Sequence, residues 1–161
     1  MIRQILVVCE GNVCRSPMAA AFLRSKLEGV SVSSAGLNAL VGSPAPEFAC
    51  DVMRLRSMPI DQHRAQQITD ELCRNTELIL VMDSDQRREL ETRYPFSKGK
   101  VYRVGEYGVF DIEDPYRQGR TVFEHCAQTI ETGVTAWVKR LGLIASGSHA
   151  RSNYPENRSR T

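Results

Sequence analysis

The sequence lacks any apolar run long enough to cross a membrane. A transmembrane helix needs roughly 20 consecutive apolar residues, and stretches such as residues 5–9 and 78–82 are far shorter. Residues 5–9 are also too short for a signal peptide, and no small-residue cleavage site follows them. We therefore expect a cytoplasmic protein that does not insert stably into a membrane.

Paired cysteines are missing as well. The cysteine count is odd, no CxxC pair is present, and no histidine stands at zinc-binding spacing. The pattern indicates free thiols in a reducing compartment rather than a secreted disulfide scaffold, and it implies no metal or other cofactor. The cysteines are Cys9, Cys14, Cys50, Cys73 and Cys126.

The sequence has little excess of charge of either sign, since its net charge is only +2. Residues 145–161 contain three arginines against one glutamate and so account for the whole excess. The remainder of the chain is close to neutral, whereas a nucleic-acid groove needs a dense basic patch. We expect no nucleic-acid partner. The Ser, Asn, Arg and Pro content of residues 145–161 predicts a disordered tail after one domain of residues 1–144.

Hydrophobic patterning predicts an α/β fold. Apolar runs typical of buried strands occur at 5–8, 30–36, 78–82 and 101–104. Helical spacing or helix boundary signals occur at 17–27, 47–57, 84–93 and 122–141. Strands alternating with helices indicate a parallel sheet with right-handed crossovers, in which ligands bind beyond the carboxyl ends of the strands.

The segment that carries most information is residues 8–17, which read VCEGNVCRSP. It places Cys9 at the end of a buried strand, then a tight loop, then Arg15 at a helix start. Backbone N–H groups in such a loop form an anion site, and the helix N-terminus adds a positive dipole that favours the thiolate of Cys9. Arg15 can bind two phosphate oxygens through its planar guanidinium.

Neighbouring residues also suit a loop that binds an anion beside a thiolate. Ser16 can donate a hydrogen bond to the thiolate, Gly11 allows close approach of the backbone, and Asn12 tolerates left-handed dihedral angles. A cysteine six residues before an arginine is common by chance, and a cysteine that ends a strand is usually just buried. Here the strand, the Gly-Asn pair and the Arg-Ser-Pro sequence all coincide.

This V-C-x-G-N-x-C-R-S-P pattern resembles the signature of the low-molecular-weight protein tyrosine phosphatases, and the likeness extends over most of residues 3–142. The resemblance implies Cys9 as nucleophile, Arg15 as phosphate ligand and Ser16 as thiolate-stabilising hydroxyl. It also implies a four-stranded parallel sheet flanked by helices on both faces, a three-layer arrangement like that of flavodoxin. The implied phosphate-binding residues are Glu10, Gly11, Asn12, Val13, Cys14, Arg15 and Ser16.

A general acid is needed because phenolate leaves poorly unless it is protonated. Asp114-Pro115-Tyr116 resembles the acid motif of the family, which implies Asp114 as acid and later as activator of water. Asp111 and Glu113 are weaker candidates. Tyr116 is the expected aromatic wall beside the substrate ring, although a bare Asp-Pro-Tyr is also a common turn.

On the opposite wall, animal members tend to carry an aromatic residue where this chain has Leu40. The stretch around Leu40 is similar to bacterial members paired with tyrosine kinases of exopolysaccharide export. The implied partner is therefore a tyrosine-phosphorylated protein, such as a bacterial autokinase. A monomer is favoured over an oligomer.

The resemblance also implies a supporting network of Asn12, Ser34 and His63 that holds the loop in shape. Two roles remain open for Cys14: a disulfide with Cys9 that protects the nucleophile from overoxidation, or a small residue packed under the loop. The other cysteines fall on apolar helix faces and are expected to be inert.

Three alternative functions share parts of this pattern. Thiol-dependent arsenate reductases resemble this chain around the loop, but they require further cysteines after the third strand, where this chain reads Val-Met-Asp-Ser. Phosphoarginine phosphatases carry threonine where this chain has Val13, whose bulkier apolar side chain suits an ester substrate better. A phosphate-binding module without catalysis would need no acid, so Asp114 could be replaced without consequence, and the presence of both a nucleophile and an acid argues against it.

Overall fold

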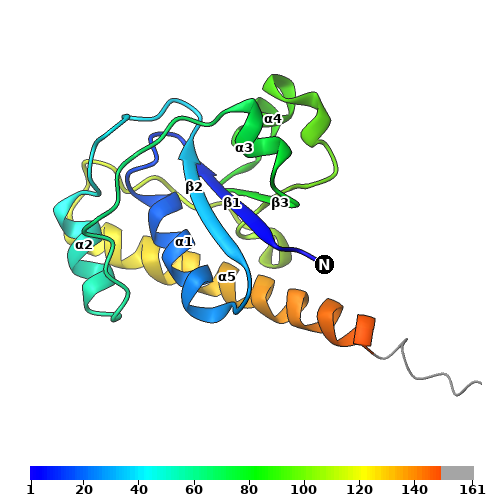
Figure 1. Ribbon diagram of the computed structural model, residues 1–161. Helices are drawn as coiled ribbons and strands as arrows, with labels where there is room; N and C mark the ends of the chain where they lie inside the picture. Colours follow the sequence, from blue (N-terminus) through cyan, green and yellow to red (C-terminus); the bar gives the residue numbers. More distant parts are fainter. Residues whose placement is uncertain (150–161) are drawn as a thin grey trace, which may run out of the picture.

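The computed structural model describes residues 1–149 and contains one parallel sheet at its centre (Figure 1). The strands are β1 (Gln4–Cys9), β2 (Ser31–Gly36), β3 (Leu78–Val81) and β4 (Val101–Arg103). Their order across the sheet is β2-β1-β3-β4, and every pairing is parallel. The predicted four-stranded α/β fold is confirmed.

Helices cover both faces of the sheet (Figure 1). One face packs against α1 (Arg15–Lys26), α2 (Glu47–Arg54) and α5 (Arg120–His149). The other packs against α3 (Asp70–Arg74) and α4 (Ser84–Arg93). Side chains of β1 alternate between the two resulting cores, as the two-residue period of a strand requires: Ile5 and Val7 enter one core, Leu6 and Val8 the other.

The chain order of the strands determines where the site lies. From β1 the chain passes to β2 on one side and then crosses to β3 on the other. The loop that leaves the carboxyl end of β1 therefore sits where the winding direction reverses, which is the usual ligand position in open α/β sheets. Among the described helices, none is long and apolar enough to span a bilayer.

Local contacts fix the neighbouring elements. Asp83 caps α4 through a 2.8 Å hydrogen bond from the backbone N–H of Gln86. Helix α5 approaches β4 at Gly133, where a Cβ atom would lie 2.6 Å from the carbonyl oxygen of Val104. Glycine is required there because any side chain would push the helix away from the sheet.

Several element boundaries differ from the sequence predictions. Helix α1 begins at Arg15, two residues before the predicted start. Helix α2 ends at Arg54, because the chain turns at Ser57 with a φ of 60°. The short helix α3 was not predicted. Helix α5 continues to His149, past the predicted domain end at 144, and residues 150–161 of the predicted tail lie outside the described residues.

Candidate active site

The phosphate loop, residues 9–16, connects β1 to the first turn of α1. Its outer carbonyl oxygens, those of residues 9, 10 and 11, accept hydrogen bonds of 2.9, 2.9 and 3.0 Å from the backbone N–H groups of residues 37, 38 and 40. By contrast, the N–H groups of residues 10–14 donate to no protein acceptor in the described part of the chain. Successive unpaired N–H groups beside a helix N-terminus are suited to hold an anion.

The loop keeps this shape with one left-handed residue and one close contact. Asn12 has a φ of 57°, in the region that asparagine tolerates better than most residues. At Gly36, a Cβ atom would lie 2.7 Å from the carbonyl oxygen of Glu10, so only glycine lets β2 end this close to the loop. Gly11 is less constrained, since a Cβ atom there would meet Leu40 at 3.7 Å, an ordinary contact.

Cys9 lies at the bottom of the loop with only 3% of its surface exposed. Its Sγ atom is 2.9 Å from the Oγ atom of Ser16. That oxygen already accepts a 2.8 Å hydrogen bond from the side-chain amide of Asn12. The hydroxyl hydrogen of Ser16 is therefore available to the sulfur, which suits a sulfur that carries negative charge.

Asn12 is the centre of the support network, and all of its side-chain polar atoms are bonded. Besides Ser16, its amide donates to Ser34 Oγ at 3.0 Å, and its Oδ1 accepts from the N–H of Gln66 at 2.9 Å. Its backbone oxygen is 2.6 Å from Nε2 of His63. The sequence predicted Asn12, Ser34 and His63 together but missed Gln66, for which the sequence held no signal.

His63 is half-buried, and its environment determines its protonation. Burial lowers the pKa of its imidazole, the hydrogen bond to the Asn12 carbonyl opposes that effect, and the charges of Arg24 and Arg64 lower the pKa further. Because a carbonyl oxygen can only accept, Nε2 carries the proton in this contact. The neutral imidazole can make this bond without a second proton.

Arg15 reaches from α1 across to the loops that follow β3 and β4. Only 4% of the residue is exposed, and its Nη1 donates to the carbonyl oxygen of Ile112 at 2.8 Å. Its guanidinium lies 3.5 Å from Oδ2 of Asp114 and 3.8 Å from Oδ2 of Asp83. The sequence did not indicate that Asp83 both caps α4 and faces this arginine.

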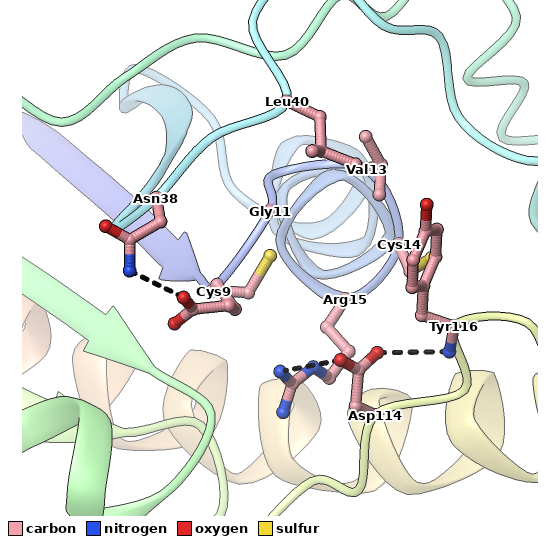
Figure 2. A pocket seen from close by; sticks show the side chains of 10 residues that line it. Cys9, Gly11, Val13, Cys14, Arg15, Asn38, Leu40, Asp114 and Tyr116 are labelled. Carbon is pink, nitrogen blue, oxygen red and sulfur yellow. Dashed lines mark hydrogen bonds and ion pairs between the residues drawn. The ribbon is translucent and has the colours of Figure 1, made fainter.

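The acid loop, residues 105–119, brings Asp114 and Tyr116 to the cavity (Figure 2). The side chain of Asp114 is 48% exposed, and its Oδ1 accepts from the N–H of Tyr116 at 3.1 Å. The nearby Asp111 instead pairs with Arg103 at 3.0 Å and does not line the cavity; neither does Glu113. Asp114 is thus the carboxylate of this loop that lines the cavity together with Cys9.

These parts enclose a cavity of about 150 Å³. Its floor is the phosphate loop, and Figure 2 shows Leu40, Val13 and Tyr116 around its rim. Leu40 and Tyr116 are 43% and 38% exposed, so both apolar surfaces are open to an incoming ring. Asn38 also lines the cavity, which the sequence had not indicated.

All five cysteines are free thiols, and Cys14 is buried in the core while it also lines the cavity. Burial strongly raises the pKa of the Cys14 thiol and raises the pKa of the Cys126 thiol to about 12. Both sulfurs are therefore protonated at neutral pH. Across the described residues, no three His, Cys, Asp or Glu side chains gather as metal ligands would.

Comparison with known proteins gives these features a family context. Residues 4–145 match the family model described as low molecular weight phosphotyrosine protein phosphatase. The chain is 52% identical over 144 residues to the probable low molecular weight protein-tyrosine-phosphatase EpsP of Ralstonia nicotianae, a match that covers 89% of this chain and 99% of the relative.

Solved structures share the fold. The Wzb protein of Vibrio vulnificus in complex with benzylphosphonate superposes with a TM-score of 0.84 at 37% identity, over 87% of this chain and 99% of that one. The YwlE arginine phosphatase from Geobacillus stearothermophilus also gives a TM-score of 0.84, at 30% identity, over 96% of this chain and 99% of that one. The scaffold alone therefore does not distinguish phosphotyrosine from phosphoarginine.

Proposed function

The chain belongs to the low-molecular-weight protein-tyrosine phosphatase family, and we propose that Cys9, Arg15 and Asp114 carry out its hydrolysis of phosphotyrosine. The supporting observation is that a thiol and a guanidinium from the phosphate loop and a carboxylate from the distant acid loop line one small cavity. A phosphate-binding module without catalysis would need only the loop and the arginine.

In the first step the phosphate dianion enters the loop and accepts hydrogen bonds from the unpaired N–H groups of residues 10–14 and from Arg15. The Cys9 thiolate attacks phosphorus and forms an S–P bond as the bond to the phenolic oxygen breaks. Asp114 in its acid form donates its proton to that oxygen, so tyrosine leaves as a neutral phenol.

In the second step the Asp114 carboxylate removes a proton from water, and the water oxygen attacks the phosphocysteine. The S–P bond breaks, phosphate is released and Cys9 returns to the thiolate. The Ser16 hydroxyl, 2.9 Å from the sulfur, stabilises the thiolate as it leaves. Asp114 regains its proton in this step and is ready for the next turnover.

The experiment is Cys9→Ser, assayed on a phosphotyrosine peptide, with Cys50→Ser as the matched control. Cys50 lies on α2 outside the cavity. We expect Cys9→Ser to abolish turnover while still binding inorganic phosphate, and Cys50→Ser to retain both. Turnover at the original rate in Cys9→Ser would contradict the proposed nucleophile.

For the substrate, we propose a tyrosine-phosphorylated protein of the cytoplasm, in particular a bacterial tyrosine kinase of exopolysaccharide export, bound by a monomeric phosphatase. Support comes from Leu40 in the wall and from the 52% identity to EpsP. The phosphoarginine alternative has weaker support, because Val13 occupies the position where that group carries threonine.

A panel of phosphotyrosine, phosphoserine and phosphoarginine peptides, assayed with and without orthovanadate, tests this assignment. We expect vanadate-sensitive release of phosphate from the phosphotyrosine peptides, with the phosphoserine and phosphoarginine peptides hydrolysed far more slowly. Preferential hydrolysis of phosphoarginine would contradict it.

A further inference from the structure

We infer that Glu10 is a specificity-determining residue: its carboxylate favours phosphotyrosines flanked by basic residues and disfavours those flanked by acidic or phosphorylated ones. This inference rests on the proposed function. It concerns the side chain of Glu10, whereas the anion site uses only the backbone of that residue.

Glu10 lines the active-site cavity as an exposed side chain at the mouth of the phosphate loop. Asn38 holds the residue at two points. The backbone N–H of Asn38 donates to the carbonyl oxygen of Glu10 at 2.9 Å, and its side-chain amide donates to Oε1 at 2.6 Å. The carboxylate is thus held beside the cavity instead of moving freely in solvent.

Asn38 is itself fixed by side chains from two further segments. Arg93, at the end of α4, donates to Oδ1 of Asn38 at 3.2 Å and to the carbonyl oxygen of Leu37 at 2.5 Å. Gln67 donates to the same Leu37 oxygen at 2.8 Å. These bonds hold Glu10, Asn38 and the nearby Leu40 wall in one arrangement, so the position of the carboxylate is determined by the fold.

Among the described residues, the carboxylate of Glu10 forms no ion pair. Within residues 1–149, no lysine or arginine nitrogen lies within 4.0 Å of its carboxylate, whereas Asp83 and Asp114 both face Arg15. Arg93, which binds Asn38, pairs with Glu89 at 2.5 Å. Oε2 of Glu10 accepts no hydrogen bond from the described residues. This oxygen is therefore available to an incoming cation.

The geometry of the reaction brings substrate side chains to this point. The phosphate must reach Cys9, which directly precedes Glu10, and the ring must pass between Leu40 and Tyr116. The substrate backbone then lies across the mouth, with the residues on either side of the phosphotyrosine near the rim. A basic side chain there is attracted to Glu10, and a carboxylate or second phosphate is repelled.

The expected size follows from Coulomb interactions at a partly exposed site. One charge pair across several ångströms near a protein surface changes kcat/KM by about three- to tenfold, and salt weakens the effect. One consequence concerns clusters of tyrosines: a phosphotyrosine whose neighbour is also phosphorylated should be hydrolysed more slowly than an isolated one.

The test compares three phosphotyrosine peptides that differ only in the flanking residues, which are lysine, alanine or glutamate on both sides. We measure kcat/KM for the wild-type protein, for Glu10→Gln and for the control Glu28→Gln. The glutamine introduced by Glu10→Gln keeps an oxygen for the Asn38 amide but loses the charge. Glu28 is an exposed carboxylate before β2, at the opposite end of the strands.

For wild type we expect the lysine peptide to exceed the glutamate peptide by about three- to tenfold at low salt, with the ratio approaching one in high salt. Glu10→Gln should lower the ratio toward one at low salt, and Glu28→Gln should leave it unchanged. A ratio that Glu10→Gln does not alter, or a wild-type ratio at or below one, overturns the inference while the phosphatase activity stands. Failure of wild type to hydrolyse any of the three peptides overturns the proposed function and this inference with it.

The salt dependence of the wild-type protein provides a second measurement that needs no variant. A lysine-to-glutamate ratio that stays constant as salt rises also overturns the inference, because an effect of shape rather than charge would not be screened.

Discussion

The phosphate loop and the acid loop hold the two halves of the proposed reaction, yet they are held in different ways. In the phosphate loop, Cys9, Asn12 and Ser16 are 3%, 0% and 0% exposed, and their side chains bond to one another. In the acid loop the side chain of Asp114 is 48% exposed; it accepts a hydrogen bond from the adjacent Tyr116 N–H and forms an ion pair of 3.5 Å with Arg15.

Ile112 is one of the residues that attach the acid loop to the core. Its N–H donates to the carbonyl oxygen of Met82 at 2.9 Å, and its carbonyl oxygen accepts from Arg15. The difference separates two tasks. In the proposed mechanism the phosphate loop must keep its donors fixed before the anion arrives, whereas Asp114 exchanges protons with the leaving group and water and so needs access to solvent.

This comparison predicts that substitutions in the acid loop affect turnover without affecting stability. Asp114→Asn should lower kcat on a phosphotyrosine peptide by about two to four decades, because phenolate must then leave unprotonated. The midpoint of thermal unfolding should change little, because a substitution at an exposed position usually alters stability by no more than about 0.5 kcal/mol. The matched control is Asp111→Asn, in the same loop, which should keep kcat near wild type. Equal losses in the two variants would contradict the assignment of Asp114.

Substitutions in the phosphate loop, in contrast, should lower stability as well as activity. Asn12→Ala leaves Ser34 Oγ and the Gln66 N–H without their partner and places alanine at a φ of 57°. We expect a loss of about 2–4 kcal/mol in the free energy of unfolding, measured by denaturant titration, and weaker phosphate binding.

Asn12→Gly separates the two causes of that loss. Glycine tolerates the positive φ but restores no hydrogen bond, so it should recover about 1 kcal/mol relative to alanine. If both variants were as stable as wild type, the network around Asn12 would not support the loop.

At the mouth of the cavity the effect should be smaller. Tyr116→Ala removes one wall beside the substrate ring and should raise KM by about two- to tenfold, as expected for one aromatic contact. Tyr116→Phe keeps the ring and should remain near wild type, which distinguishes stacking from hydrogen bonding by the hydroxyl. A change in kcat with KM unchanged would indicate that Tyr116 acts in the chemical step and not as a wall beside the substrate ring.

The smallest expected effect is on the pH dependence of the free energy of unfolding. Burial lowers the pKa of His63 below its ordinary value of 6.5, so the folded state binds its proton less readily than the unfolded chain does. The neutral form stabilises the fold above pH 6.5, and this contribution is lost as pH falls through the folded-state pKa.

His63→Gln keeps a donor for the Asn12 carbonyl but cannot titrate. Denaturant unfolding at about pH 5 and pH 7.5 should therefore show a shallower pH dependence in the variant than in wild type. Identical slopes would show that His63 does not couple to folding in this range.

The same contrast explains what could be predicted from the sequence. The phosphate loop is contiguous, so the order of Cys9, Asn12, Arg15 and Ser16 along the chain already indicated its geometry. The four strands also followed from apolar runs that a buried parallel sheet requires.

The remaining contacts join distant segments through polar groups that carry no periodic signal. The carbonyl of Ile112 that binds Arg15, the Asp83 carboxylate behind it and the Gln66 N–H on Asn12 depend on how loops cross in three dimensions. Asn38 was likewise missed, because an asparagine after a strand is usually a turn residue. Helix α3 is too short to give a helical pattern.

The most direct test of the mechanism is to trap the phosphorylated enzyme. Asp114→Asn is mixed with p-nitrophenyl phosphate, whose leaving group departs without protonation, so Cys9 is phosphorylated while the water-activating carboxylate is absent. Acid quenching and mass spectrometry of the peptides should then find one phosphoryl group on Cys9. A phosphoryl group on another residue, or steady release of nitrophenol with Cys9 never modified, would contradict nucleophilic attack by this cysteine.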